Sequence, residues 1–287
     1  MNIILIFLIL SILPIIMISK YTDDYRNYKN IKKMENVPNL ESFGLDKIKF
    51  AEGIPKIIYR THKDKNIIRN FQEEFNITSK NCPGYKTEFY TNEECDKFVK
   101  DNFSERIYNA YSNINVEYGA CKADLFRYLI VYLKGGIYLD IKSVVVKNID
   151  SILKKYPDKL IVHHPWIIPY VNAFSYSFPP WGEYNQWCIV SPKGHPILKK
   201  IIEKIVYNIE LETNRRDKIF SGGLDVLTLT GPHMFTKVIK DNNNKGVKEI
   251  GFNFDGCFKK KKSLLTDYKS KYGKNTHYYK LSSNIIS

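Results

Sequence analysis

The sequence contains few cysteines, and their number and spacing argue against two kinds of structural crosslink. Only five occur among its 287 residues, and no two of them form a C-x-x-C pair. Such pairs usually open a structural zinc site, and an even number of cysteines usually marks a disulfide framework. We therefore expect neither feature and predict buried free thiols at Cys82, Cys95, Cys121, Cys188 and Cys257.

The sequence also lacks the short motifs of several enzyme and binding classes. It has no G-x-S-x-G, P-loop or H-E-x-x-H pattern, so nothing in it supports a hydrolase, NTPase or metalloprotease. No zinc-finger, RRM or KH signature accompanies its basic residues.

Acidic residues are outnumbered, with 30 Asp and Glu against 44 Lys and Arg and a formal net charge of +14. A positive field attracts nucleic acid, anionic lipid and nucleotide diphosphates alike, so the charge does not identify a target. A membrane-anchored protein that binds nucleic acid is one hypothesis, which predicts strongly salt-dependent binding to DNA or RNA. Without a supporting motif, we predict no nucleic-acid partner.

A long apolar run does occur at the N-terminus. Residues 2–19 carry no charge, and this length is close to the minimum for a helix that spans a bilayer. Basic residues do not precede the run and an A-x-A-like site does not follow it, so we predict an uncleaved anchor. The predicted organisation is a transmembrane helix over residues 1–19, a polar stem over 20–50 and one catalytic domain over 51–287.

The side of the membrane on which the domain lies is left open. Basic residues follow the apolar run, which by the positive-inside rule places the domain in the cytosol. Two N-x-S/T sequons, at Asn76 and Asn102, instead fit a lumenal domain. We predict a single-pass protein of Golgi or ER-type endomembranes.

Apolar stretches typical of strands alternate with helical patterns from residue 54 onward. Strands are predicted at 54–61, 85–91, 137–141 and 160–166, and helices around 67–75, 125–133, 195–212 and 224–240. The last helical stretch contains a Gly-Pro interruption. This alternation predicts an α/β domain with a mainly parallel sheet, whose ligands bind beyond the carboxyl ends of the strands.

The most informative stretch is "EYGACKADLFRYLIVYLKGGIYLDI", residues 117–141. Its apolar residues recur at helical spacing until Gly135 and Gly136, which end the helix. A short strand follows and ends in Asp140. Asp140 therefore lies where a ligand is expected.

Three segments resemble glycosyltransferase family 32, a DxD-containing group that includes initiating mannosyltransferases and viral and bacterial relatives. They are "IPKIIYRT" at 54–61, "KADLFRYLIVYLKGGIYLDI" at 122–141 and "LTLTGPHMFT" at 227–236. The resemblance implies a GT-A fold, a nucleotide-sugar donor, a divalent metal such as Mn²⁺, and transfer of a hexose with retention at the anomeric carbon.

The resemblance also implies roles for particular residues. Asp124 and Arg127 match the family's Asp and Arg, and Asp140 matches the first Asp of DxD. His277 matches a C-terminal histidine and would join Asp140 as a metal ligand. From spacing alone, Asp124 and Arg127 would form an ion pair on one helical face, worth about half a kcal/mol. Next to Asp140, the alternative is that Asp124 bonds donor hydroxyls while Arg127 supports it or contacts phosphate.

Other residues are expected to contact the nucleotide part of the donor. Tyr59 and Arg60 lie where the family's first strand meets the nucleotide, and Tyr59 would stack on a base unless it simply packs in the core. Gly136 is included in this predicted donor site.

Position 142 departs from the family pattern, because Lys142 stands where a second acidic residue would help to hold a metal. In an extended segment, residues 140 and 142 would face the same site. Three interpretations remain: the metal still binds through Asp140, phosphates and His277; Lys142 itself neutralises the diphosphate; or the site is inactive. Asp225 is a spare carboxylate that would replace the missing ligand.

Several further aromatic and histidine residues have both a structural and a functional interpretation. Three tryptophans, at positions 166, 181 and 187, would either form a sugar platform or pack in the core. His163 and His164 point to opposite faces of a regular strand, so they are not expected to ligate one ion together. His195 and His233 begin helices, where capping or surface roles are expected.

The leading hypothesis is a membrane-anchored, retaining glycosyltransferase with Asp140, Asp124 and Lys142 at its catalytic centre. Its partners would be a nucleotide-sugar donor and a glycan, protein or lipid acceptor. The alternative is an inactive GT-A domain that binds glycan or nucleotide-sugar as a membrane-tethered adaptor.

Overall fold

The structure, a computed structural model, describes residues 43–163, 183–216, 220, 222–250, 257–260 and 281–287. In this part of the chain no helix is both long and apolar enough to cross a bilayer. The predicted anchor, residues 1–19, lies outside the described residues, as do Trp166, Trp181 and His277.

A six-stranded sheet in the order β2-β1-β3-β6-β5-β7 forms the centre of the domain. Its strands are β1 (Ile57–Thr61), β2 (Lys86–Tyr90), β3 (Gly136–Leu139), β5 (Leu160–His163), β6 (Cys188–Ser191) and β7 (Val247–Ile250). β6 is antiparallel to both of its neighbours, whereas the other pairings are parallel. The prediction of an α/β domain with a mainly parallel sheet is thus confirmed. A second sheet pairs β4 (Ser143–Val145) with β8 (Phe258–Lys260).

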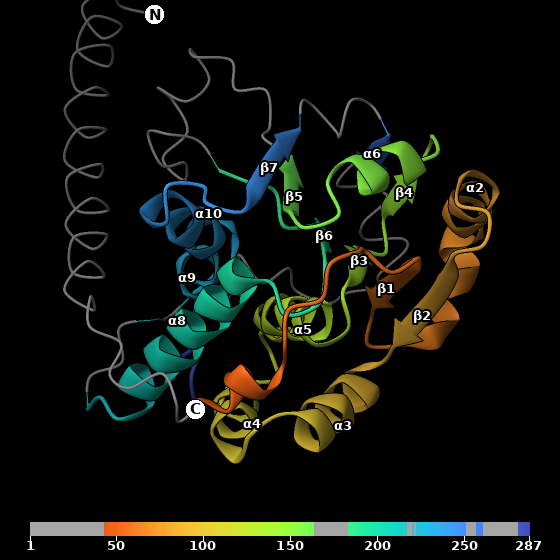
Figure 1. The fold of residues 1–287 in the computed structure, drawn as a ribbon. Coiled ribbons are helices and arrows are strands. Elements are labelled where there is room, and N and C mark those ends of the chain that lie inside the picture. Colours follow the sequence, from red (N-terminus) through yellow and green to blue (C-terminus); the bar gives the residue numbers. More distant parts are fainter. Residues whose placement is uncertain (1–42, 164–182, 217–219, 221, 251–256, 261–280) are drawn as a thin grey trace, which may run out of the picture.

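Helices surround the sheet, and α5 occupies the middle of the molecule, in contact with β3, β6, α8 and α9 (Figure 1). The α-helices are α2 (Gln72–Asn81), α3 (Asn92–Asn102), α4 (Glu105–Ser112), α5 (Gly119–Lys134), α6 (Asp150–Lys155), α8 (Pro196–Thr213), α9 (Gly223–Leu229) and α10 (Pro232–Asp241). Two 3-10 helices, η2 (Leu45–Lys47) and η3 (Lys65–Phe71), complete the described helical segments.

Most of the predicted elements are present, with shifts at their ends. The helix expected at 67–75 is divided into η3 and α2, and the helical stretch at 224–240 is divided at Gly231 into α9 and α10. β3 ends at Leu139, two residues before the predicted end. The five cysteines are buried and free, as predicted.

The alternation of side chains along β3 directs its residues to two separate cores. Ile137 and Leu139 pack in one hydrophobic cluster, and Tyr138 packs in the other, together with the buried face of α5. Because successive side chains of a strand point to opposite faces, the residue two after Tyr138 is directed toward α5. That residue is Asp140.

The glycines between α5 and β3 make a close turn possible. Gly135 has φ of 70° and Gly136 has φ of 104°, a region that favours glycine. A Cβ on Gly136 would lie 2.9 Å from the carbonyl oxygen of Ile57. Gly136 is buried at the start of β3, whereas Asp140 follows the end of the strand, four residues or about 13 Å further on, and a donor contact of Gly136 stays a prediction.

Residues 43–51, most of which were expected in a polar stem, pack along the domain and form a segment that we call the strap. Phe43 and Leu45 belong to the main core, and the Arg106 guanidinium lies 3.8 Å from the centroid of the Phe43 ring. The strap ends in a bridge between Ala51 and Lys193, shortly after the end of β6. The folded part of the chain therefore begins before residue 51.

Candidate active site

A tight turn after β3 presents Asp140 at the carboxyl edge of the sheet. The amide of Ser143 donates a hydrogen bond to the carbonyl of Asp140 at 2.8 Å, which closes the turn over residues 140–143. The amide of Asp140 donates to the carbonyl of Trp187 at 2.9 Å. The expectation of an extended segment through residue 142 is therefore wrong, so strand alternation does not place Lys142 beside Asp140.

Helix α5 brings Asp124 and Arg127 to Asp140. The Arg127 Nη2 atom lies 3.0 Å from Asp124 Oδ1 and 3.4 Å from Asp140 Oδ1, so one guanidinium joins both carboxylates. Its Nη1 atom donates to the carbonyl of Gln186 at 3.0 Å, and its plane lies over the Tyr138 ring. The structure thus brings together three of the residues that the sequence placed in one site.

The three charged groups of this site differ in accessibility. The side chains of Asp124 and Arg127 are 5% and 7% exposed, whereas that of Asp140 is 25% exposed. Of the three groups, the Asp140 carboxylate is therefore the one that a ligand reaches most readily.

Burial and charge shift the pKa values of the two buried groups. Burial raises the pKa of the Asp124 carboxyl to about 6, although Arg127 and Gln186 oppose the shift. For Arg127, burial alone would lower the pKa, but the acidic groups of Tyr138, Asp140 and Asp124 outweigh it and raise the pKa above its ordinary value. Arg127 therefore stays protonated.

Arg60 supports the same turn from the other side of the sheet. Its buried guanidinium donates to the carbonyls of Asp140 at 3.1 Å, Ile141 at 3.3 Å and Ser143 at 2.9 Å. It also donates to the Thr78 hydroxyl at 3.2 Å. In this structure the Arg60 side chain is 0% exposed and holds backbone, and its nucleotide contact stays a prediction.

Tyr59 lies in the hydrophobic core. The apolar residues around it in the sequence are compatible both with this position and with one at the ligand-binding edge of the sheet. The Tyr59 side chain is 0% exposed and belongs to the cluster formed around α5. This position fits the packing interpretation, and stacking of Tyr59 on a donor base stays a prediction.

Lys142 is partly exposed in the turn and contributes charge near the end of β1. Its ammonium group is among the influences that lower the pKa of His62, after the larger effect of burial. His62 directly follows β1, which is parallel to β3. Lys142 thus adds positive charge to the sheet edge that carries Asp140.

The described residues do not provide the donor set of a divalent-metal site. No group of three or more His, Cys, Asp or Glu residues in this part of the chain is arranged to hold a metal ion. Asp140 is joined to Arg127, and Asp124 is buried behind it. Mn²⁺ and Mg²⁺ prefer several accessible oxygen ligands, and His277 lies outside the described residues. Metal binding at Asp140 and His277 stays a prediction.

Other predicted residues have defined places. His195 caps α8, with its Nδ1 accepting the Ile197 amide, which confirms the capping role. His233, in the first turn of α10, lies 3.4 Å from Glu183, and His163 lies 2.9 Å from the side chain of Asn185. Trp187 is buried and Asp225 lies in the first turn of α9.

Sequence reasoning missed two residues that contact Asp124. The Gln186 side-chain amide donates to Asp124 Oδ1 at 2.9 Å, and the Thr230 hydroxyl donates to Oδ2 at 3.1 Å. Thr230 lies in the "LTLTGPHMFT" segment, and the resemblance of that segment to the family is the signal that could have identified it. Gln186 lies two residues before β6, outside the segments that resemble the family, and its place gives no comparable signal.

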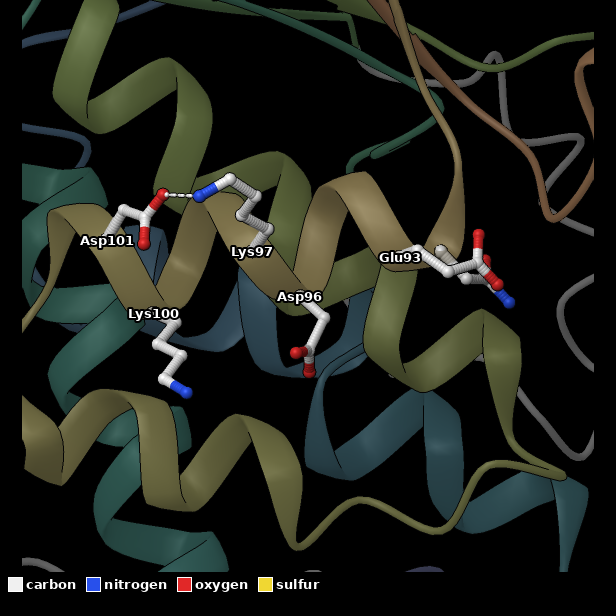
Figure 2. A pocket seen from close by; sticks show the side chains of 6 residues that line it. Glu93, Asp96, Lys97, Lys100 and Asp101 are labelled. Atoms are coloured by element: carbon white, nitrogen blue, oxygen red, sulfur yellow. Dashed lines mark hydrogen bonds and ion pairs between the residues drawn. The ribbon is translucent and has the colours of Figure 1, made fainter.

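A surface hollow along α3 is separate from this site. Its lining residues come from that helix alone: Asn92, Glu93, Asp96, Lys97, Lys100 and Asp101. Figure 2 shows their acidic and basic side chains along the exposed side of α3, where Lys97 pairs with Asp101 at 2.7 Å. This mixture of charges is typical of a solvated helix face.

The family comparison matches the region that contains the site. Residues 69–158 match the family model described as "Glycosyltransferase sugar-binding region containing DXD motif". This region includes Asp124, Arg127, Asp140 and Lys142.

Curated relatives are similar over a larger part of the chain. The initiation-specific alpha-1,6-mannosyltransferase of Schizosaccharomyces pombe is 28% identical over 209 residues, which cover 69% of this chain and 51% of the relative. The protein of the same name from Candida albicans is 26% identical over 240 residues, covering 76% and 60%. An uncharacterized glycosyltransferase of Acanthamoeba polyphaga mimivirus is 39% identical over 70 residues, covering 24% and 27%.

The chain spans roughly half of the length of the first two relatives, 51% and 60%. Among solved structures, the PaToxG glycosyltransferase superposes with a TM-score of 0.46 at 20% identity, covering 78% of this chain and 80% of that one. The family match and the two yeast relatives confirm the resemblance of this chain to the DxD-containing glycosyltransferases of family 32.

Proposed function

We propose that the protein is a retaining glycosyltransferase that moves a hexose from a nucleotide-sugar donor to a glycan, protein or lipid acceptor. The observation that carries this proposal is the convergence of Asp124, Arg127 and Asp140 at the carboxyl edge of the sheet. Ligands of open α/β sheets bind at this edge. The matched sugar-binding region contains the same three residues, which supports a nucleotide-sugar as the ligand.

Asp140 is proposed to contact the donor, because it is the most accessible of the three groups. Arg127 holds its carboxylate from the α5 side, and Arg60 holds the turn backbone from the other side. Such a preorganised carboxylate orients the sugar without further rearrangement. A direct contact of Asp124 with the sugar hydroxyls stays a prediction, and in this structure Asp124 supports Arg127.

Lys142 is proposed to stabilise the diphosphate that leaves during transfer. The bond between the anomeric carbon and the phosphate oxygen breaks, and negative charge accumulates on the diphosphate. The acceptor oxygen bonds to the anomeric carbon on the same face, and its proton passes to the leaving phosphate. A flexible ammonium group near this oxygen balances the charge. A metal such as Mn²⁺ would supply the same stabilisation if the complete chain binds one.

The first donor to test carries mannose, because the two yeast relatives are named as mannosyltransferases. Their acceptors are not transferred to this chain, which spans about half of their length. A panel of mannosyl, glucosyl and galactosyl nucleotides, offered with and without simple oligosaccharide acceptors, tests the donor class directly.

The decisive experiment measures donor turnover by the full chain and by Asp140→Asn, in Mn²⁺ and in EDTA. We expect turnover by the natural chain and a loss of at least about 100-fold in the variant, because a charge-assisted contact made in the transition state is lost. Asp101→Asn on the surface of α3 is the matched control and should match the natural chain. Absence of turnover and of donor binding under every condition would refute the proposal.

Two substitutions at position 142 separate the roles of lysine and metal. Lys142→Met should weaken donor turnover in EDTA by about tenfold if the ammonium group neutralises phosphate. Lys142→Asp should make turnover depend more strongly on Mn²⁺, since it provides a second acidic ligand. Equal turnover by both variants and the natural chain would show that Lys142 has no role in the reaction.

We further propose that residues 1–19 anchor the protein in a Golgi or ER-type membrane. The support is the uncharged apolar run in the sequence. Carbonate extraction of membranes tests it: the full chain should stay in the membrane pellet and a chain that begins at residue 43 should be released. Release of both would contradict the anchor.

A further inference from the structure

Asp124 is a buried carboxylate whose orientation depends on hydrogen bonds from other elements. Its side chain is 5% exposed, and a buried ionised carboxylate is costly unless its oxygens are hydrogen-bonded. The ion pair with Arg127 serves Oδ1, at 3.0 Å. The remaining partners come from distant parts of the sequence.

Thr230 serves the second oxygen of Asp124. Its hydroxyl donates to Oδ2 at 3.1 Å, and the residue is the C-cap of α9 with 0% exposure. The same hydroxyl lies 3.3 Å from Cys121 Sγ and 3.4 Å from the Val226 carbonyl, so its position is restricted on several sides.

Gln186 serves the first oxygen and is itself fixed. Its Nε2 atom donates to Asp124 Oδ1 at 2.9 Å, while its Oε1 atom accepts from the Tyr128 hydroxyl. An ionised carboxylate only accepts hydrogen bonds, so this pattern determines which end of the amide faces Asp124. The Gln186 carbonyl accepts from Arg127 Nη1 at 3.0 Å, which ties the same residue to the guanidinium.

The neighbours of Gln186 attach its backbone to the rest of the sheet edge. The Tyr184 amide donates to the Thr236 hydroxyl at 2.7 Å, and the Asn185 side chain lies 2.9 Å from His163 Nε2. The Trp187 carbonyl accepts the Asp140 amide at 2.9 Å. Residues 184–187 therefore contact α10, β5, α5 and the turn after β3 in succession.

We propose that Gln186 and Thr230 are positioning residues, which orient the Asp124 carboxylate and through it the Arg127 guanidinium that holds Asp140. This inference rests on the proposed function. It adds to that function because neither residue needs to contact the donor. Their effect is to keep the charged groups in the geometry that the donor meets.

The chain offers a closely matched set of variants. Thr230→Val removes the hydroxyl at nearly constant volume, and Thr230→Ser keeps it. Gln186→Met keeps the side-chain length and removes the amide. Thr236→Val is the control, because Thr236 is also buried and bonds the same segment through Tyr184. No hydrogen bond joins it to Asp124 among the described residues.

The expected kinetic result separates positioning from stability. Thr230→Val and Gln186→Met should each lower kcat/KM for the donor about tenfold or more, mainly through kcat, since each removes a hydrogen bond to a charged group. Thr230→Ser should retain most of the activity, and Thr236→Val should lie within about twofold of the natural chain. Thermal melts identify any variant that does not fold, in which case the other position decides.

A second measurement does not depend on activity. The titratable groups near Asp124 include the Asp140 carboxyl, the Arg127 guanidinium, the Tyr128 hydroxyl and the Cys121 thiol. Carbon-13 NMR of the Asp carboxyl groups, assigned with Asp124→Asn, follows the titration of Asp124 itself. Hydrogen bonds donated to a carboxylate favour its charged form, so Thr230→Val and Gln186→Met should raise the pKa of Asp124.

These two measurements distinguish failure of the inference from failure of the proposed function. If the natural chain turns over no donor, the proposed function fails and the NMR titration still tests the positioning. If Thr230→Val and Gln186→Met match Thr236→Val in kinetics and in titration, the positioning role is overturned. It is also overturned if Thr230→Ser loses as much activity as Thr230→Val.

Discussion

Two buried arginines hold the turn after β3 from opposite sides of the sheet, and they do so with different partners. Arg60 contacts the carbonyls of residues 140, 141 and 143 and the Thr78 hydroxyl. Arg127 contacts the carboxylates of Asp124 and Asp140. One arginine fixes the backbone of the turn, and the other fixes the charged side chain that the turn presents.

The electrostatic consequence differs in the same way. Burial lowers the pKa of Arg60 to about 10, because the acidic groups around it, led by Tyr138 and Asp140, oppose the effect of burial only in part. The acidic groups around Arg127 outweigh burial and raise its pKa. Arg60 thus stabilises the backbone of the turn on one side of the sheet, whereas Arg127 sets the electrostatics of the site on the side of α5.

The largest expected effect comes from Arg127→Met. It would leave Asp124 and Asp140 close together without their shared cation, and breaking a buried ion pair typically costs about 3–5 kcal/mol. We expect donor turnover to fall at least about 100-fold and the urea midpoint to fall clearly. Retained turnover at normal stability would show that Arg127 has no part in the site.

Arg60→Met should mainly affect stability. Loss of a charged donor to three carbonyls is expected to cost about 2–3 kcal/mol, with a smaller loss of activity than in Arg127→Met. Urea unfolding and donor kinetics on both variants measure this difference. The comparison breaks if Arg60→Met abolishes turnover while its unfolding midpoint is unchanged.

Glu203, a buried carboxylate in α8, makes the stability of the domain depend on pH. Burial raises the pKa of Glu203 to about 7, with Lys199 opposing the shift. Its folded pKa lies above the ordinary value of 4.5, so its stabilising contribution is fully present below about pH 4.5 and is lost as pH rises through 7. Glu203→Gln should therefore gain about 1–3 kcal/mol relative to the natural chain at pH 8. Equal stability curves in urea from pH 4.5 to 8 would contradict this expectation.

The smallest effect is expected at the α3 surface. Lys97 and Asp101 form an ion pair with side chains 77% and 50% exposed. Lys97→Gln should change the free energy of unfolding by less than about 0.5 kcal/mol and leave turnover unchanged. A change as large as that of Arg60→Met would assign the α3 hollow a role that its mixed charges do not indicate.

Local patterns in the sequence were sufficient to predict β1, β2, α5, α8 and the strand that precedes Asp140. They also placed Asp124 and Arg127 with Asp140, because a motif covers all three residues. The patterns did not reveal that Tyr59 and Arg60 are buried, since strand alternation shows which residues share a face but not which face is covered. Gln186 and Thr230 were missed because they meet Asp124 only through long-range packing.

The path of the strap has a consequence for how the domain is held. The strap begins beside α4, where the Ser104 hydroxyl donates to the Phe43 carbonyl at 2.8 Å, and ends beside Lys193 after β6. β6 runs antiparallel to β3, so Lys193 and the start of β3 lie at the edge opposite Asp140. The strap therefore ties the start of α4, at its Phe43 end, to the edge of the sheet that lies away from Asp140, at its Ala51 end.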